Sequence, residues 1–180
     1  VALAQQYGTP LYVTSEDRVC EQFENYNKAL TRRYPKVRIL FAAKANGNLA
    51  ILRALARLGA GADVFSSGEL HLALKAGIPA ENLLFNGSSK APGDLILAVG
   101  KGVRVSVDSL DELHQLDAAA KAAGKTAKIA FRVNPALEVP THQKIATGLA
   151  TSKFGIPHKE IPDAYQDAMS CKNIQTVGIH

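Results

Sequence analysis

The chain has 180 residues, of which 47% are hydrophobic and 21% are charged, as is typical of one soluble globular domain with a sizeable core. The formal net charge is +5, but the basic residues are scattered with few aromatic residues among them, so we expect no nucleic-acid partner. No apolar run approaches the roughly 20 residues of a membrane span, and no signal peptide is visible. The two cysteines, Cys20 and Cys171, form neither a disulfide framework nor a metal-ligand spacing, so we expect reduced thiols, no metal and a cytoplasmic location.

The first elements precede the regular part of the chain. Residues 7–13 form a short strand candidate, and no initiator methionine precedes them, so we expect further residues upstream. Thr14 or Ser15 then caps a helix that runs to about Tyr34.

A single lysine follows in an apolar run. Residues 37–45 are rich in β-branched, aromatic and small residues and are bounded by Pro35 and Gly47, which predicts a buried strand. A buried ammonium loses solvation, which lowers the pKa of Lys44 and favours a nucleophilic amine that can form a Schiff base with an aldehyde such as pyridoxal phosphate (PLP). The alternative for Lys44 is a strand-end side chain whose ammonium reaches water.

Strand and helix signals alternate from this point to the last residue. The predicted strands after residues 37–45 are 62–66, 82–86, 103–108, 128–133 and 174–179. The predicted helices between them are 48–58, 68–76, 92–99, 110–123 and 158–169. This alternation predicts an α/β fold with a parallel sheet, and the near-uniform repeats favour a TIM-type (β/α)8 barrel over an open doubly wound sheet. Because such a barrel needs eight strands and about 250 residues, we expect a barrel truncated after about six strands.

Polar residues gather at the predicted carboxyl ends of these strands, where the chemistry of a parallel barrel is found. They are Lys44, Asn46, Asp63, Ser66, Ser67, Asn86, Asp108, Arg132, Asn134 and His180. Each alone has a structural alternative, such as a helix cap or a turn. Arg132 is the hardest to explain structurally, because apolar residues surround it and a permanently charged guanidinium there needs an anion. Their common position predicts one site around Lys44.

The segments that carry these residues follow the order of a known family. They are FAAKAN (41–46), GAGADVFSSGEL (59–70), FNGSSK (85–90), VSVDSLDEL (105–113), FRVNP (131–135), THQKIATGLATSKFGI (141–156) and VGIH (177–180). The chain resembles the diaminopimelate decarboxylases, a branch of the fold-type III PLP-dependent decarboxylases that also include ornithine and arginine decarboxylases. The resemblance is collinear over essentially the whole chain. It implies a partial PLP-binding barrel over residues 14–180, with 1–13 contributing a strand to an all-β domain absent from this chain.

The same resemblance implies a role for particular residues. Lys44 matches the catalytic lysine that holds PLP as a Schiff base, the internal aldimine. The other implied positions near the cofactor are Asp63, Glu69, Arg132 and His180. Residues 134–153 are expected to form a lid, while the phosphate-binding glycine and the acidic partner of the pyridinium nitrogen are expected downstream of the chain.

The implied reaction is the decarboxylation of meso-2,6-diaminopimelate to L-lysine and CO2, the last step of lysine biosynthesis, by a homodimer. Two alternatives stay open: another fold-type III decarboxylase acting on ornithine, arginine or carboxynorspermidine, and a non-catalytic PLP-binding barrel protein. An alanine racemase matches less well, because Gly47-Asn48 replaces the Tyr-Gly expected after the lysine run. The choice of an amino-acid substrate rests on the resemblance alone.

Overall fold

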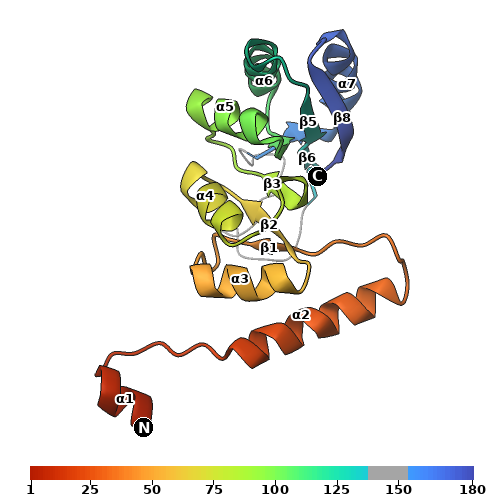
Figure 1. The fold of residues 1–180 in the computed structure, drawn as a ribbon. Helices are drawn as coiled ribbons and strands as arrows, with labels where there is room; N and C mark the ends of the chain where they lie inside the picture. Colours follow the sequence, from red (N-terminus) through yellow and green to blue (C-terminus); the bar gives the residue numbers. More distant parts are fainter. Residues whose placement is uncertain (138–153) are drawn as a thin grey trace.

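A computed structural model of the chain describes residues 1–137 and 154–180 (Figure 1). Six parallel strands form the main sheet, in the order β1-β2-β3-β4-β5-β8. They are β1 (Leu40–Ala42), β2 (Gly61–Val64), β3 (Leu83–Phe85), β4 (Arg104–Val107), β5 (Ala127–Phe131) and β8 (Ile174–Ile179). Two short parallel strands, β6 (Val133–Asn134) and β7 (Ile156–Pro157), pair with each other in the stretch between β5 and α7.

Helices alternate with the strands of the main sheet. They are α3 (Leu49–Arg57), α4 (Ser67–Lys75), α5 (Pro92–Lys101), α6 (Leu110–Ala123) and α7 (Ile161–Ser170), with short 3-10 turns η1 (Ala80–Asn82) and η2 (His158–Glu160). Figure 1 shows α3 to α7 standing in an arc on the outside of the strands. No helix within the described residues is long and apolar enough to cross a membrane.

This arrangement confirms the expected α/β architecture of a partial parallel barrel, with six strands joined by five helices. The helix starts follow the predicted chemistry: the Ser66 hydroxyl accepts from the Glu69 backbone N–H, and the Ser109 hydroxyl accepts from that of Glu112. Strands β1 to β5 are shorter than predicted, whereas β8 has the predicted bounds; β1 ends at Ala42, before Lys44.

The amino-terminal segment differs from the expectation. Residues 2–7 form helix α1 (Ala2–Tyr7), and no strand is found at 7–13, where Tyr12 is 99% exposed. A strand needs a neighbour for its backbone hydrogen bonds, and no described residue pairs with this segment. The assignment of 1–13 to a second domain stays a prediction. Helix α2 (Glu16–Thr31) follows and buries no residue.

The core lies between the sheet and the helices. Alternate strand residues, including Val64, Phe85, Val107 and Phe131, pack in one cluster with buried helix residues such as Leu113. Because neighbouring residues of a strand point to opposite faces, Asp63 and Ser106 lie on the other face of the sheet, away from the helices. The fold therefore directs the polar strand residues toward the inside of the partial barrel.

Candidate active site

Four of the predicted site residues lie at one edge of the main sheet. Lys44 follows β1, Asp63 is in β2, Arg132 directly follows β5 and His180 directly follows β8. All the strands of this sheet run parallel, and the register aligns Asp63 with Ala42. Their carboxyl ends therefore meet at the same edge, as the sequence predicted.

Two of these residues line one cleft. A cleft of about 280 Å³ is lined by Lys44, Phe65, Gly87, Ser88, Ser89, Arg132 and Phe154. The Lys44 ammonium lies 4.1 Å from the centre of the Phe65 ring, and the Arg132 guanidinium lies 4.8 Å from the centre of the Phe154 ring. Both cations are thus placed by aromatic faces, whose negative charge density attracts them.

The surroundings of Lys44 differ from the sequence expectation. The residue lies in a turn after β1, not inside a strand, and it is exposed. The backbone N–H of Ala45 donates to the Ala42 carbonyl and closes that turn. Desolvation by a surrounding strand, the reason given for an activated amine, is therefore not met in this chain. The Phe65 ring and the cleft are what position the ammonium.

Arg132 has the anion that its apolar sequence context demanded. Its Nη1 atom lies 3.4 Å from Oδ1 of Asp108, and the two side chains are 18% and 7% exposed. The other carboxylate oxygen of Asp108 is buried without a hydrogen-bond partner within the described residues. The pair holds the guanidinium at the wall of the cleft and leaves one carboxylate oxygen there for a donor.

The glycine of the FGI sequence makes this arrangement possible. Gly155 has a φ of +75°, and a Cβ atom there would lie 2.8 Å from the carbonyl oxygen of Arg132. That carbonyl accepts a hydrogen bond from the Ile156 backbone N–H. Only glycine permits both the left-handed backbone and this close approach, so Gly155 positions Phe154 beside Arg132.

Asp63 carries an incompletely satisfied carboxylate. Its Oδ2 accepts a long hydrogen bond of 3.5 Å from the Asn86 amide, while its Oδ1 is buried with no partner among the residues that the structure describes. Burial raises the pKa of Asp63, and the Asn86 hydrogen bond and the charges of His180, Lys44 and Arg132 oppose that rise. Asp63 is thus a buried acceptor within electrostatic reach of all three other predicted residues.

His180 is fixed by the neighbouring strands. Its Nδ1 lies 2.9 Å from the hydroxyl of the buried Ser106, and its backbone N–H donates to the Phe131 carbonyl. Burial lowers the pKa of His180, and Asp63 counteracts this effect. At neutral pH the ring is therefore mainly neutral and is oriented by the serine.

Glu69 does not line the cleft but contacts Phe65, a residue that does. One of its carboxylate oxygens accepts from the Phe65 backbone N–H at 2.8 Å, and its own backbone N–H donates to Ser66. Ser66 thus caps α4, and Glu69 holds the backbone of Phe65, whose ring faces Lys44. Asn46 and Asn134 stabilise turns instead, since their side chains accept from the backbone N–H groups of Asn48 and Ala136.

The sequence reasoning missed a buried ion pair. The Lys90 ammonium lies 2.8 Å from the Glu112 carboxylate, and their side chains are 0% and 11% exposed. Lys90 also donates to the carbonyl oxygen of Gly87, at the wall of the cleft. Burial raises the pKa of Glu112, and the Lys90 charge opposes that rise. In the sequence, Lys90 resembles a solvated loop lysine and Glu112 an ordinary first-turn acid of a helix, so no local signal links them.

The segment expected to form a lid, 134–153, falls mostly outside the described residues, which resume at Phe154. The described residues at its start and after it are paired, because β6 and β7 form a two-stranded sheet that begins directly after Arg132. The glycine-rich run 59–62 forms the turn after α3 and the start of β2.

Comparison with known proteins places this site in a family. The sequence pattern described as "Pyridoxal-dependent decarboxylase, pyridoxal binding domain" matches residues 16–180. Two relatives described as diaminopimelate decarboxylases, from Archaeoglobus fulgidus and Aquifex aeolicus, are 48% and 45% identical. The alignments cover 99% of this chain and 42% of each relative, so the chain spans less than half of their length.

Solved structures give the same result. The diaminopimelate decarboxylase from Helicobacter pylori complexed with L-lysine has a TM-score of 0.94 and 36% identity over 99% of this chain and 45% of its own. The enzyme of the same name from Methanocaldococcus jannaschii in complex with L-lysine has a TM-score of 0.91 and 38% identity, over 99% and 43% of the two chains. The partial barrel of this chain is therefore the amino-terminal part of that fold.

Proposed function

Because this chain belongs to the pyridoxal-dependent decarboxylase family, as its pyridoxal-binding domain, we propose that the whole protein decarboxylates meso-2,6-diaminopimelate to L-lysine and CO2 with PLP as cofactor. The observation that carries this proposal is the convergence of Lys44, Asp63 and Arg132 with His180 at one edge of the sheet. An electrophilic cofactor needs an amine to hold it, a cation for its anionic groups and a means of orienting it, and this edge offers all three.

The cleft fits such a cofactor. A primary amine, that of Lys44, lies beside the aromatic ring of Phe65, in a cleft that Arg132 also lines. Buried carboxylate oxygens of Asp63 and Asp108 have no hydrogen-bond partner within the described part of the chain. These are the groups that a bound polar ligand with donors and a positively charged region would satisfy.

PLP, when bound, supplies the electron sink for the carbanion that loss of CO2 leaves behind. The residues of this chain do the rest. Lys44 is the residue that would hold the cofactor, through its primary amine Nζ. Arg132, held by Asp108 and Phe154, provides a fixed positive charge for an anionic group. Neutral His180, oriented by Ser106, presents a ring of fixed position rather than a second cation.

The remaining parts of this proposal concern the whole protein. Residues 14–180 form the PLP-binding part, and residues 1–13 lead to a second, β-rich domain. The assembly is a homodimer in the cytoplasm. The substrate is an amino acid, and both solved relatives named above are complexed with L-lysine, the proposed product.

The test uses the full-length protein with Lys44→Ala and, as a matched control, Lys75→Ala in the last turn of α4. We expect Lys44→Ala to lose the absorbance of bound PLP and the release of CO2 from meso-2,6-diaminopimelate, while the control keeps both. Retention of both properties by Lys44→Ala contradicts the proposal. Faster release of CO2 from ornithine or arginine than from meso-2,6-diaminopimelate would keep the reaction class and replace the substrate.

A further inference from the structure

A second group of chemically reactive side chains lies on the outer layer, away from the strand-end cleft. His114 is in the first half of α6, Asp167 is near the end of α7, and Cys171 directly follows α7. The two helices precede β5 and β8, which are neighbours in the sheet, so α6 and α7 stand side by side (Figure 1). Residues far apart in the sequence are thus brought to one helix–helix junction.

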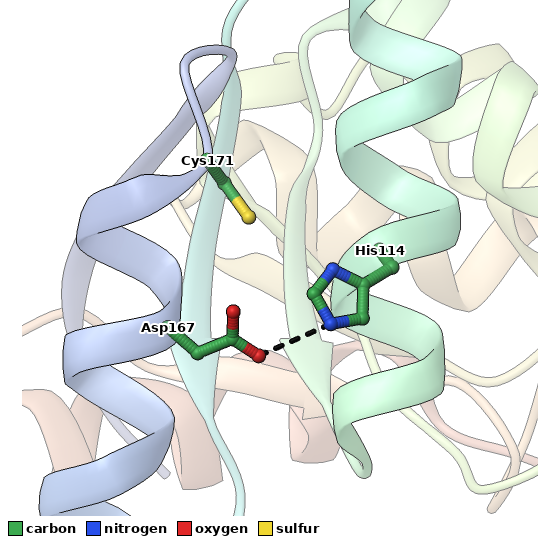
Figure 2. A group of neighbouring side chains, drawn as sticks. All are labelled: His114, Asp167 and Cys171. Atoms are coloured by element: carbon green, nitrogen blue, oxygen red, sulfur yellow. Dashed lines mark ion pairs between the residues drawn. The ribbon is translucent and has the colours of Figure 1, made fainter.

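The three side chains converge. The His114 Nε2 atom lies 3.1 Å from a carboxylate oxygen of Asp167, and the nitrogen, the oxygen and the Cys171 sulfur all lie within 4.8 Å of one another. Figure 2 shows the three side chains pointing toward a common point between the two helices. No other such group of three occurs within residues 1–137 and 154–180.

These spacings suit a tetrahedral metal. Zinc–ligand bonds of about 2.0–2.3 Å place the ligand atoms of a tetrahedron about 3.3–3.8 Å apart. The group needs a contraction of at most about 1 Å to reach this range, and His114, whose side chain is 57% exposed, is free to make it. A nitrogen, a sulfur and a carboxylate oxygen together select zinc or a similar transition metal, because magnesium and calcium take oxygen ligands alone.

The local charge also favours a cation. Two carboxylates, those of Asp117 and Asp167, act electrostatically on Cys171. Asp117 is held in place beside the group, because one of its oxygens accepts from the backbone N–H of Asn173 at 2.9 Å and from its side-chain amide at 3.1 Å. A bound metal ion would offset the negative charge of these carboxylates.

We propose that His114, Asp167 and Cys171 bind one Zn²⁺ ion, with water in the fourth position, and that the ion fixes α6 to α7. The proposal is independent of the decarboxylase function, since none of the three residues lines the strand-end cleft. Its expected role is structural: an ion bound only by the folded protein stabilises it against unfolding.

The first test measures the ligand set directly. Co²⁺ is added to the full-length protein, and the near-ultraviolet charge-transfer band of a cobalt–thiolate bond is recorded as a difference spectrum against the metal-free protein. We expect one equivalent of Co²⁺ to give this band, and Zn²⁺ to displace it. The band should vanish in Cys171→Ser and persist in Cys20→Ser, which removes the other cysteine of these 180 residues, on α2.

The second test measures affinity by titration with chelator-buffered Zn²⁺. We expect His114→Gln and Asp167→Asn to weaken binding by about 100-fold or more, because loss of mere outer partners of metal ligands already costs about 10–100-fold. Asp117→Asn should weaken it by about tenfold, and His71→Gln on α4 should leave it unchanged. Asp167→Asn is nearly isosteric, so it decides the question if Cys171→Ser does not fold. A wild-type protein without the thiolate band, or equal Zn²⁺ affinity in Asp167→Asn, overturns the proposal.

Discussion

Two ion-pair clusters in this molecule share similar distances but differ in burial. In the strand-end site, Lys90 with Glu112 and Arg132 with Asp108 form pairs whose side chains are at most 18% exposed. At the α6–α7 junction, the paired His114 is 57% exposed. Burial makes the inner pairs indispensable for positioning, because an unpaired buried charge is expensive. Because the outer pair is exposed, breaking it costs little free energy, and its side chains can bind a ligand instead of each other.

The largest expected effect is at the fully buried lysine. Lys90→Met leaves Glu112 as a buried carboxylate without its cation, and it frees the Gly87 carbonyl at the cleft wall. We expect the free energy of unfolding to fall by about 3–5 kcal/mol, measured by urea denaturation of the full-length protein. The control is the double variant Lys90→Met with Glu112→Leu, which should recover most of the loss. A single-variant loss below about 1 kcal/mol, typical of exposed pairs, would refute the importance of this burial.

The second effect concerns the close approach behind Arg132. Gly155→Ala places a Cβ atom 2.8 Å from the Arg132 carbonyl oxygen at a φ of +75°. We expect a loss of about 1–3 kcal/mol in the free energy of unfolding together with weaker PLP binding, measured by absorbance titration. Gly93→Ala on α5 is the matched control, because its Cβ would meet no atom within 4 Å, and it should be neutral or slightly stabilising. Equal free energies of unfolding and equal PLP affinities for the two variants would show that the backbone at Gly155 accommodates a Cβ atom and would contradict the prediction.

The third effect has the opposite sign. Asp63→Asn removes a buried carboxylate whose pKa is raised by burial. A raised pKa in the folded state means that stability is full below the ordinary value of 3.8 and is lost as the pH rises through the folded pKa. We therefore expect the variant to be more stable than the wild type at pH 7, by about 1 kcal/mol, and to have little decarboxylase activity. Thermal unfolding at acid and neutral pH measures this gap, which should widen toward neutral pH; a gap of reversed sign would contradict the account.

A smaller pH effect is expected at His180. Burial lowers its pKa below the ordinary 6.5, so the unfolded chain binds a proton more readily than the folded one. Stability should therefore be full above pH 6.5 and should fall as the pH drops through the folded pKa of His180. In His180→Gln this part of the pH dependence should disappear, which thermal unfolding between pH 7 and pH 5 would reveal. An unchanged slope would assign the dependence to other groups.

The smallest effect is expected at the junction. With metal removed by a chelator, His114→Gln breaks only an exposed pair, and it should change the free energy of unfolding by less than about 1 kcal/mol in urea denaturation. Comparing the losses in the free energy of unfolding for His114→Gln and Lys90→Met therefore measures the difference between the two clusters. A loss as large as that at Lys90 would mean that the junction is buried in the whole protein.

Much of this organisation was predictable because its causes are local. Apolar runs between glycines and prolines marked the strands, and Ser66, for which a helix cap was one alternative, caps α4 in the structure. The parallel order then brought the strand-end residues to one edge. The prediction that Arg132 needs an anion was also correct, because Asp108, which also lies at a strand end, pairs with it.

The rest depends on contacts between distant segments. Lys90 is buried in an ion pair with Glu112 of helix α6, which is distant in the sequence. In the sequence, Glu112 is already explained as an acidic residue in the first turn of a helix, so nothing indicates a partner for it. The exposure of Lys44 follows from the early end of β1, which strand propensity alone does not place. The group around Cys171 escaped notice because its members are not spaced as a metal motif and meet only through the packing of α6 on α7.

One measurement tests the central claim, that Lys44 is the residue that holds the cofactor. The full-length protein is reduced with sodium borohydride in the presence of PLP, digested and mapped by mass spectrometry. We predict that a reduced pyridoxyl group is found on the peptide that contains Lys44, and that Lys75 and Lys90 are unmodified. A pyridoxyl group on another lysine, or none on Lys44, would contradict the account.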